Sequence, residues 1–208
     1  MKVIHLISGG DSGGAKTHVL SLLQHLNQTI TAQLVCFRDG PFAEEARQMG
    51  IPTMICGGNN VFRTRRKLAA YIREGGYEII HCHGSRANMI GAMLRKVTGL
   101  PVVTTVHSDY RLDYMGRPFA RLTFGAINAW ALRHLDYRIG VSDAMVDLLI
   151  SRGFPADRFY TIYNGIDFTP PPTQGDRLEY LRNLGADVDE NSVVVGIAAR
   201  MNPVKDMA

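Results

Sequence analysis

Short apolar runs rich in β-branched residues alternate with amphipathic segments along most of this chain. The runs cover residues 3–7, 30–37, 52–56, 77–82, 101–106, 137–141 and 159–163. Such alternation is typical of βαβ units, in which the strands form one parallel sheet and helices cover both of its faces. The sequence therefore predicts a doubly wound α/β domain.

In an open parallel sheet, ligands bind at the carboxyl ends of the strands. A glycine-rich stretch, residues 8–18, follows the first predicted strand. Four polar residues follow later strands, namely His83, His107, Ser142 and Asn164. We expect these groups to line one crevice.

The overall composition is that of an ordinary soluble globular protein. The 208 residues are 20% charged and 46% hydrophobic, with a net charge of +4 and a pI near 9.1. A chain of this length buries a sizeable core. The small positive charge indicates attraction to anions but is too weak to indicate nucleic acid, so we expect no nucleic-acid partner.

The cysteines and the hydrophobic runs bear on where the protein is found. Cys36, Cys56 and Cys82 are odd in number and lie in or beside apolar runs, which predicts buried, reduced thiols. The N-terminus enters a strand directly, without an apolar stretch of signal-peptide length. No run is long enough to span a bilayer. We therefore expect a cytoplasmic protein.

The glycine-rich stretch predicts a loop that approaches an anion. Its four glycines allow positive φ angles, and the N–H groups of the following helix face the ligand. A Walker A motif is disfavoured because Ala15 stands before Lys16, where that motif has a glycine. The pattern G-x-G-x-x-G fails as well, and no acidic residue ends the second strand. A tight turn without a ligand is the alternative, but it needs fewer glycines.

The sequence His81-Cys82-His83 raises the question of a metal site. In a strand, His81 and His83 share one face and Cys82 points to the other. Two histidines with no third ligand nearby make a poor zinc site. We therefore expect no metal ion, a buried His81, and a His83 that stands beside the crevice.

His107 is the candidate catalytic residue. It follows a six-residue apolar strand, and Ser108, Asp109 and Tyr110 add polar groups at the same edge. A neutral imidazole at this place can hydrogen-bond a hydroxyl group or shuttle a proton. The alternative is a loop histidine that bonds to its own neighbour, Asp109.

The basic run 63–67 contains Arg65 and Arg66 and predicts one basic side of a helix, and Arg117 and Arg121 follow later. These charges could meet an anionic acceptor or phospholipid headgroups. A solvated helix face would show the same pattern. Both interpretations stay open.

Three consecutive prolines, residues 170–172, interrupt helix and strand alike and predict a connector. We place one domain at residues 1–172 and a second segment at 173–208. This segment contains a polar helix near 175–184 and a buried-type strand at 192–198, which indicates the start of a truncated second domain. Without a sheet of its own, that strand should be poorly ordered, pack on the domain edge or pair with another chain.

Several motifs recur in a fixed order along the chain. They are Gly13-Gly14-Ala15 with His18, His81-Cys82-His83-Gly84, Val103-Thr104-Thr105-Val106-His107-Ser108, Gly140-Val141-Ser142, Ile162-Tyr163-Asn164-Gly165-Ile166-Asp167, and Ala199-Arg200-Met201-Asn202-Pro203-Val204-Lys205-Asp206. Their order and spacing resemble the family-four retaining glycosyltransferases. That family has the GT-B architecture of two Rossmann-like domains facing a cleft. The resemblance runs through essentially the whole chain.

The resemblance implies roles for individual residues. Gly13 and Gly14 would approach the diphosphate of a nucleotide-sugar donor, and Arg200 with Lys205 would neutralise the leaving diphosphate. His107 would lie beside the transferring sugar, with Ser108 close to it. The further candidates for binding the sugar or the acceptor are His83, Asn164, Arg65 and Arg66.

The resemblance also implies the reaction, which is transfer of a sugar from a UDP- or GDP-sugar to a glycan, glycolipid or small-molecule acceptor. The family retains anomeric configuration and is usually metal-independent, so no cofactor is expected. Residues 1 to about 170 would be the acceptor-side domain. Because the donor-binding domain is largely missing, we expect this chain alone to be inactive.

Three further expectations concern partners and alternatives. The chain should be cytoplasmic, with peripheral contact at the inner membrane face through its acceptor. A homodimer through the exposed domain face would fit. The alternative functions are a sugar epimerase or phosphorylase of the same architecture, and a non-catalytic Rossmann-like module that binds a phosphorylated ligand.

Overall fold

The computed structural model describes residues 1–10, 14–58, 60–112, 119, 121–165 and 175–195, with the backbone alone for residue 121. The chain divides into two compact units, Met1–Gly165 and Ile166–Ala208. The first unit contains the sheet. The predicted proline connector at 170–172 lies outside the described residues.

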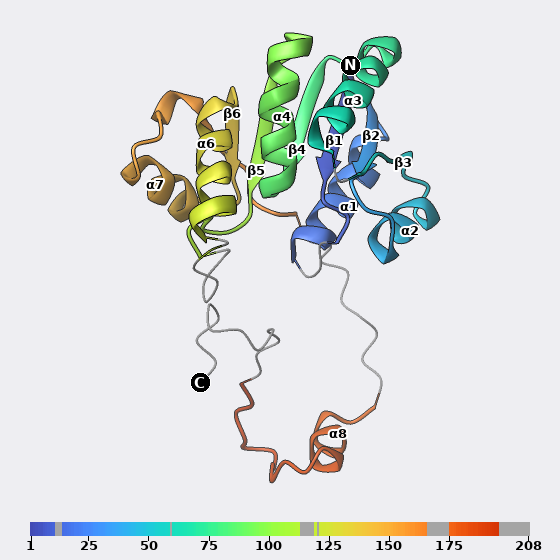
Figure 1. The fold of residues 1–208 in the computed structure, drawn as a ribbon. Helices are drawn as coiled ribbons and strands as arrows, with labels where there is room; N and C mark the ends of the chain where they lie inside the picture. Colours follow the sequence, from blue (N-terminus) through green and yellow to red (C-terminus); the bar gives the residue numbers. More distant parts are fainter. Residues whose placement is uncertain (11–13, 59, 113–118, 120, 166–174, 196–208) are drawn as a thin grey trace. The chain divides into compact units, whose positions relative to one another are not determined.

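Seven strands of the first unit form one parallel sheet (Figure 1). Their order is β3-β2-β1-β4-β5-β6-β7, and all neighbouring pairs are parallel. The strands are β1 (Lys2–Ile7), β2 (Thr31–Cys36), β3 (Thr53–Ile55), β4 (Ile79–His83), β5 (Val102–Val106), β6 (Tyr137–Gly140) and β7 (Phe159–Thr161). Each strand lies within one of the apolar runs or overlaps most of it, which confirms the predicted α/β class.

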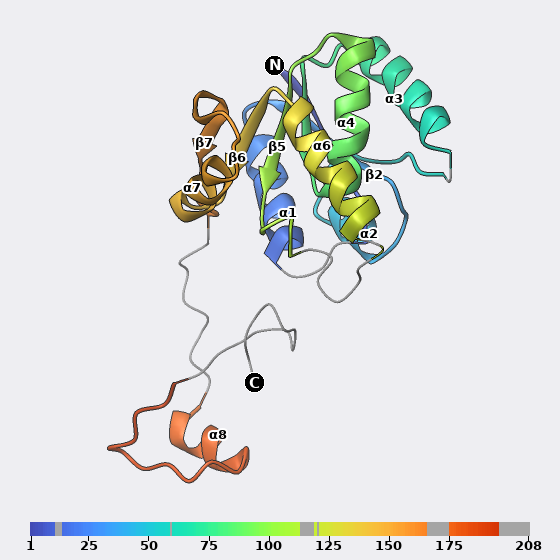
Figure 2. The same cartoon turned by 60° about the vertical axis from the view of Figure 1, so that its left-hand side comes forward.

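Helices connect the strands and cover both faces of the sheet. They are α1 (Gly14–Leu26), α2 (Pro41–Gln48), α3 (Val61–Gly75), α4 (Ser85–Thr98), a π-helical turn η1 (Arg121–Gly125), α6 (Ala126–His134), α7 (Asp143–Ser151) and a 3₁₀ turn η2 (Ala156–Arg158). α3, α4 and α6 lie side by side on one face (Figures 1 and 2). α1 and α2 pack against the other face. This arrangement confirms the doubly wound sheet.

Alternation along the strands separates the two largest clusters of buried apolar side chains, one on each face of the sheet. Ile4 of β1 and Cys82 of β4 pack with α3, α4 and α6. Ile7, three residues after Ile4, packs with α1 and α2. His81 and His83 flank Cys82, so they lie on the α1 side of the sheet. The predicted separation of Cys82 from the two histidines is therefore confirmed.

The direction in which strands are added reverses between β1 and β4. The chain proceeds from β1 outward to β3, then returns and places β4 on the other side of β1. The helices that directly follow these two strands, α1 and α4, cover opposite faces, so the loops after β1 and β4 diverge. A crevice is expected at the carboxyl ends of these two strands.

The three cysteines are free and buried, as predicted. Burial raises the pKa of the Cys82 thiol, which keeps it protonated. No helix in the described part of the chain is long and apolar enough to cross a membrane.

The second unit contains the predicted polar helix, α8 (Arg177–Asn183). The strand predicted at 192–198 is wrong for residues 192–195, which form no strand, and the rest of that run lies outside the described residues. Val193 and Val195 are 90% and 91% exposed. A β-branched run forms a strand only when a neighbouring strand pairs with its backbone. The described residues of this unit contain no neighbouring strand that could pair with this run.

Candidate functional site

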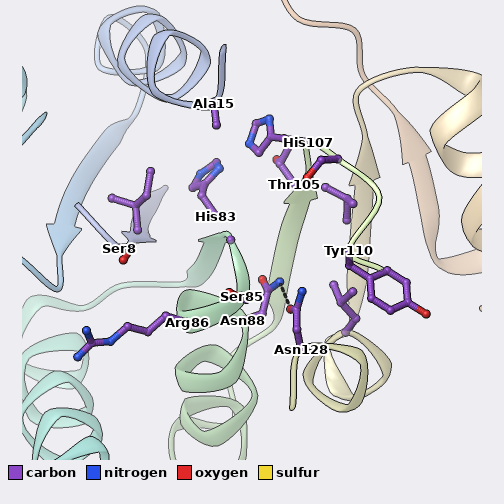
Figure 3. A pocket seen from close by; sticks show the side chains of 15 residues that line it. Ser8, Ala15, His83, Ser85, Arg86, Asn88, Thr105, His107, Tyr110 and Asn128 are labelled. Carbon is purple, nitrogen blue, oxygen red and sulfur yellow. Dashed lines mark hydrogen bonds between the residues drawn. The ribbon is translucent and has the colours of Figure 1, made fainter. Parts of the chain in front are cut away.

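A pocket of about 390 Å³ lies at the carboxyl ends of β1, β4 and β5. Ser8 and Ala15 reach it from the loop after β1 and from the first turn of α1, and His83 reaches it from the end of β4 (Figure 3). His107 and Ser108 contribute from the loop after β5. The structure therefore places the glycine-rich stretch, His83 and His107 in one crevice, at the point where strand addition reverses.

Gly9 sets the path of the loop after β1. Its φ is +85°, and a Cβ at this position would lie 2.4 Å from the carbonyl oxygen of Arg38. Glycine alone lets the loop pass so close to the end of β2. A Cβ on the next residue, Gly10, would lie 3.4 Å from a guanidinium nitrogen of Arg38. The loop therefore runs against a positive charge.

The start of α1 is open. No atom of the described residues lies within 4 Å of the place that a Cβ on Gly14 would take. Lys16 forms an ion pair with Glu45 of α2 and does not line the pocket. A Walker A lysine reaches the β- and γ-phosphates, so this pairing agrees with the argument against that motif. Gly13 lies outside the described residues.

Five histidines gather on the α1 side of the sheet. The register of β1 against β4 pairs His5 with His81, and His83 follows two residues later on the same face. Ring centroids lie 4.6 Å apart for His5 and His81, and 4.4 Å apart for His81 and His83. His18 of α1 lies 5.0 Å from His107, and His83 lies 5.9 Å from His107. The expectation that no third ligand stands near the His81–His83 pair is wrong, because strand pairing brings in His5.

Burial keeps these imidazoles neutral. It lowers the pKa of His5 to about 3 and, together with the neighbouring histidines, holds the pKa values of His81 and His83 well below the usual range. The pKa of His107 falls to about 4, chiefly through burial and then through the nearby His18. A neutral ring has one N–H and one lone pair, so it can accept as well as donate a hydrogen bond.

Four ring nitrogens in this cluster have no hydrogen-bond partner among the described residues. They are Nε2 of His5, His18 and His107, and Nδ1 of His83. Each such buried group costs about 1–3 kcal/mol, and native proteins contain few of them. The cluster is therefore suited to a ligand, an ion or an ordered water that supplies the missing partners.

Two buried asparagines add neutral polar groups to the pocket (Figure 3). Asn88 of α4 donates from Nδ2 to Oδ1 of Asn128 of α6 at 3.0 Å. The hydroxyl of Thr104 in β5 donates to Oδ1 of Asn88 at 2.6 Å. Because these bonds fix the amide planes, the pocket presents oriented groups that suit a ligand rich in hydroxyls.

Arg86 brings a positive charge to the pocket wall. It lies in the first turn of α4, donates to the carbonyl oxygen of Gly58 at 3.0 Å, and sits 5.4 Å from the centre of the Phe37 ring. The N-terminus of α4 adds the partial positive charge of its free N–H groups. This side of the pocket therefore favours an anion.

Asp109 is engaged away from His107. Its carboxylate forms a bidentate ion pair with Arg152 and accepts from the backbone N–H of Arg111 at 2.9 Å. These bonds, with that of Arg152 first, hold the pKa of Asp109 below its usual value. The alternative in which His107 simply bonds to Asp109 is thereby weakened.

The other predicted crevice residues lie elsewhere. Ser142 caps α7 by accepting from the N–H of Met145 at 3.2 Å, and Asn164 is exposed. Neither belongs to the pocket lining among the described residues. They follow β6 and β7, and successive strands are about 4.8 Å apart across a sheet. The pocket therefore brings together only part of the predicted set, with His83 and His107 in its lining and Ser142 and Asn164 outside it.

Arg65 and Arg66 line a different hollow, of about 750 Å³, along α3. Arg117, Arg200 and Lys205 lie outside the described residues. Four residues of this region were not predicted from the sequence, namely His5, Asn88, Asn128 and Arg86. Only Arg86 carried a local signal, namely a cation in the first turn of a helix that follows a strand.

Comparison with known proteins bears on the family. The sequence model of Glycosyltransferase Family 4 matches residues 12–169. An Escherichia coli relative, UDP-Gal:alpha-D-GlcNAc-diphosphoundecaprenol alpha-1,3-galactosyltransferase, is 24% identical over 200 residues, which are 86% of this chain and 48% of the relative. EpsF of Bacillus subtilis (strain 168), named as a glycosyltransferase, is 26% identical over 100% of this chain and 56% of its own length. The chain thus spans about half the length of the curated relatives it matches.

Solved structures share the fold. The crystal structure of Anabaena Alr3699/HepE in complex with UDP superposes with a TM-score of 0.70 at 22% identity, covering 89% of this chain and 50% of that one. A glycosyltransferase from Rickettsia africae superposes with a TM-score of 0.66 at 16% identity, covering 91% and 50%. Because the family model matches well over half of the residues, this chain belongs to Glycosyltransferase Family 4.

Proposed function

We propose that this chain is the acceptor-side part of an enzyme that transfers a sugar from a nucleotide-sugar donor to a glycan or lipid-linked acceptor. The observation that carries the proposal is the pocket at the ends of β1, β4 and β5, where His107 stands beside the glycine-rich loop and the start of α1. Family membership supports the class of reaction.

A uridine diphosphate sugar is the proposed donor. The Escherichia coli relative is named for UDP-Gal, and the HepE structures were solved with UDP and with UDP-glucose. Departure of the nucleoside diphosphate builds negative charge, which fixed cations and helix N–H groups stabilise. Gly14, the first residue of α1, fills this role in the proposal together with Gly13, Arg200 and Lys205, so the leaving group needs no metal ion.

His107 is proposed to contact the transferring sugar. Its ring is neutral at physiological pH, and its Nε2 has no partner among the described residues. The ring can therefore accept a hydrogen bond from a sugar hydroxyl as positive charge develops on the sugar. Ser108 and His83 lie in the same pocket and are proposed to bind the sugar or the acceptor. Retention of anomeric configuration belongs to this proposal.

The proposed acceptor is a glycan, with a lipid-linked one favoured by the name of the Escherichia coli relative. Contact with the cytoplasmic face of a membrane would then bring acceptor and pocket together. Two features of the first unit support such contact. Arg65 and Arg66 stand on α3, and large apolar side chains are exposed at and after residue 119, with Phe119 85% and Leu122 74% exposed.

The test is a transfer assay on the full-length protein with UDP-glucose, UDP-galactose and GDP-mannose and a panel of lipid-linked and free glycans. We expect acceptor-dependent release of UDP, with product anomer identified by NMR. His107→Ala should lower kcat by at least about a hundredfold. His25→Ala, at an exposed position in the last turn of α1, is the matched control and should leave kcat unchanged.

The same assay separates the alternatives. Conversion of the donor to an epimer without an acceptor would replace the proposal with an epimerase. Tight nucleotide binding by the 208 residues alone, with no turnover by the full-length protein, would replace it with a binding module. We expect the 208 residues alone to show no turnover, because the family draws most donor contacts from its other domain.

A further inference from the structure

We propose that His5, His81 and His83 form a binding site for a divalent transition-metal ion, with Zn²⁺ as the best match. The inference concerns a site separate from the residues proposed to hold the diphosphate. It does not depend on the proposed transfer reaction, because it rests on the geometry of three side chains.

The three imidazoles converge. One ring nitrogen of each lies within 4.8 Å of one on each of the others, and their residues are 0%, 7% and 2% exposed. Nδ1 of His5 is 3.2 Å from Nε2 of His83. Two nitrogens bound to one tetrahedral zinc ion at about 2.0–2.1 Å are about 3.3–3.4 Å apart. The observed spacing therefore needs little adjustment to accept a shared metal ion.

The protein alone leaves two ring nitrogens of the trio unpaired. Nε2 of His5 and Nδ1 of His83 are buried and lack a hydrogen-bond partner among the described residues. The rings could satisfy one another only in part, since the one bond between His5 and His83 uses a single nitrogen of each. Buried polar groups in native proteins are nearly always satisfied by protein, water or an ion. The spacing of 3.2 Å assigns Nδ1 of His5 and Nε2 of His83 to the metal ion, so the two unpaired nitrogens on the outer sides of these rings would be left to ordered water.

The surroundings suit a ligand set of this kind. His81 is oriented by Thr105, whose hydroxyl lies 2.8 Å from Nε2 of the ring. Such a bond orients the ring, and when Nε2 donates to the hydroxyl, the lone pair on Nδ1 is available to a metal. Imidazole ligands suit zinc, copper and nickel better than calcium or magnesium.

The fourth position would face the pocket. Of the three histidines, His83 is the one that lines the pocket, so an open coordination position would be reached from the pocket beside His83. Three neutral imidazoles leave the charge of the ion uncompensated. A hydroxide or another oxygen anion is therefore the favoured fourth ligand, as in three-histidine zinc sites.

The experiment measures metal binding directly. Untagged full-length protein is stripped with a chelator, titrated with Co²⁺ and Zn²⁺, and followed by visible absorption and by metal content per chain. We expect one ion per chain, a tetrahedral Co²⁺ spectrum and displacement of Co²⁺ by Zn²⁺. His5→Gln, His81→Gln and His83→Gln should each weaken binding more than tenfold, and His25→Gln should leave it unchanged.

Two further variants keep the result decisive. Thr105→Val retains all three ligands and serves if a histidine variant fails to fold, and we expect about tenfold to a hundredfold weaker binding from it. His107→Gln removes a neighbouring ring outside the trio and should not abolish binding. Less than one ion per chain at micromolar Zn²⁺, or equal binding by the trio variants and His25→Gln, overturns the proposal. So does a loss confined to His107→Gln.

Discussion

At the residue scale, the strictest constraint on the loop after β1 is the conformation of Gly9. With φ at +85° and the Arg38 carbonyl in the place of a Cβ, Gly9→Ala combines backbone strain with a steric clash. We expect a loss of about 1–3 kcal/mol in the free energy of unfolding. Urea denaturation followed by circular dichroism measures it.

Gly14→Ala is the matched control for that substitution. Gly14 is the first residue of α1 and has open space where a Cβ would stand. Alanine is favoured over glycine within helices by about 1 kcal/mol, so this variant should be neutral or more stable. Equal destabilisation by both substitutions would show that the Arg38 carbonyl does not govern the loop.

The ion pair of Asp109 with Arg152 predicts a pH dependence. Both side chains are 14% exposed, and the pairing lowers the pKa of Asp109 in the folded state. The pair therefore stabilises the fold above the unfolded pKa of 3.8, and this contribution disappears as pH falls through the folded pKa. Asp109→Asn should cost about 1–3 kcal/mol at pH 7.

The measurement compares urea unfolding of the wild type and Asp109→Asn at pH 7 and at the lowest pH where both still fold. The difference between them should shrink towards that lower pH. Asp157→Asn is the control, because Asp157 is 76% exposed and its pairing with Arg158 is loose at 3.5 Å. A constant difference across the range would mean that the carboxylate charge is not what stabilises the fold.

At the scale of the elements, α4 packs closely on the sheet because Gly91 stands over Cys82. A Cβ at Gly91 would lie 2.4 Å from the Cys82 sulfur and 3.1 Å from a methyl group of Val102. Gly91→Ala should therefore destabilise the fold by about 1–3 kcal/mol through overpacking. In a double-mutant cycle, Cys82→Ala should relieve much of this cost, because it removes the sulfur. Additive effects of the two substitutions would contradict the close packing.

Helices and strands could be predicted from the sequence where they depend on the pattern of neighbouring residues. Apolar runs such as 101–106 depend on residues next to one another, and the structure confirms a strand there. Which strand pairs with which depends on residues that lie far apart in the chain. His5 meets His81 only because β4 returns to the side of β1, 76 residues along the chain. A pattern of single residues cannot specify that pairing, so the third histidine was missed.

Packing between helices hides site residues in the same way. Asn88 and Asn128 bond across α4 and α6, and nothing in either helix alone marks them as partners. The opposite error occurred with Asn164, which follows a predicted strand yet lies outside the pocket. Position after a strand predicts the correct edge of the sheet, but the order of strands decides which residues at that edge meet.

At the scale of the whole molecule, the proposed membrane contact falls on the face of the sheet that carries α3, α4 and α6. The basic residues Arg65 and Arg66 lie on α3 of this face, and exposed apolar side chains such as Leu122 and Trp130 lie on η1 and α6, which contact each other. Basic residues near an anionic bilayer contribute about 1 kcal/mol each. Arg65→Ala combined with Arg66→Ala should therefore weaken binding to anionic vesicles by about 2 kcal/mol, or about thirtyfold.

Vesicle sedimentation of the full-length protein measures this binding, with phosphatidylglycerol and phosphatidylcholine vesicles compared at low and high salt. Arg177→Ala combined with Arg182→Ala removes the same charge from exposed positions on α8 and should have little effect. High salt should weaken the electrostatic part of the affinity, since exposed charges are screened within about 10 Å at 0.1 M. Equal affinity for anionic and neutral vesicles, or equal losses in the two double variants, would show that the basic side of α3 is only a solvated helix face.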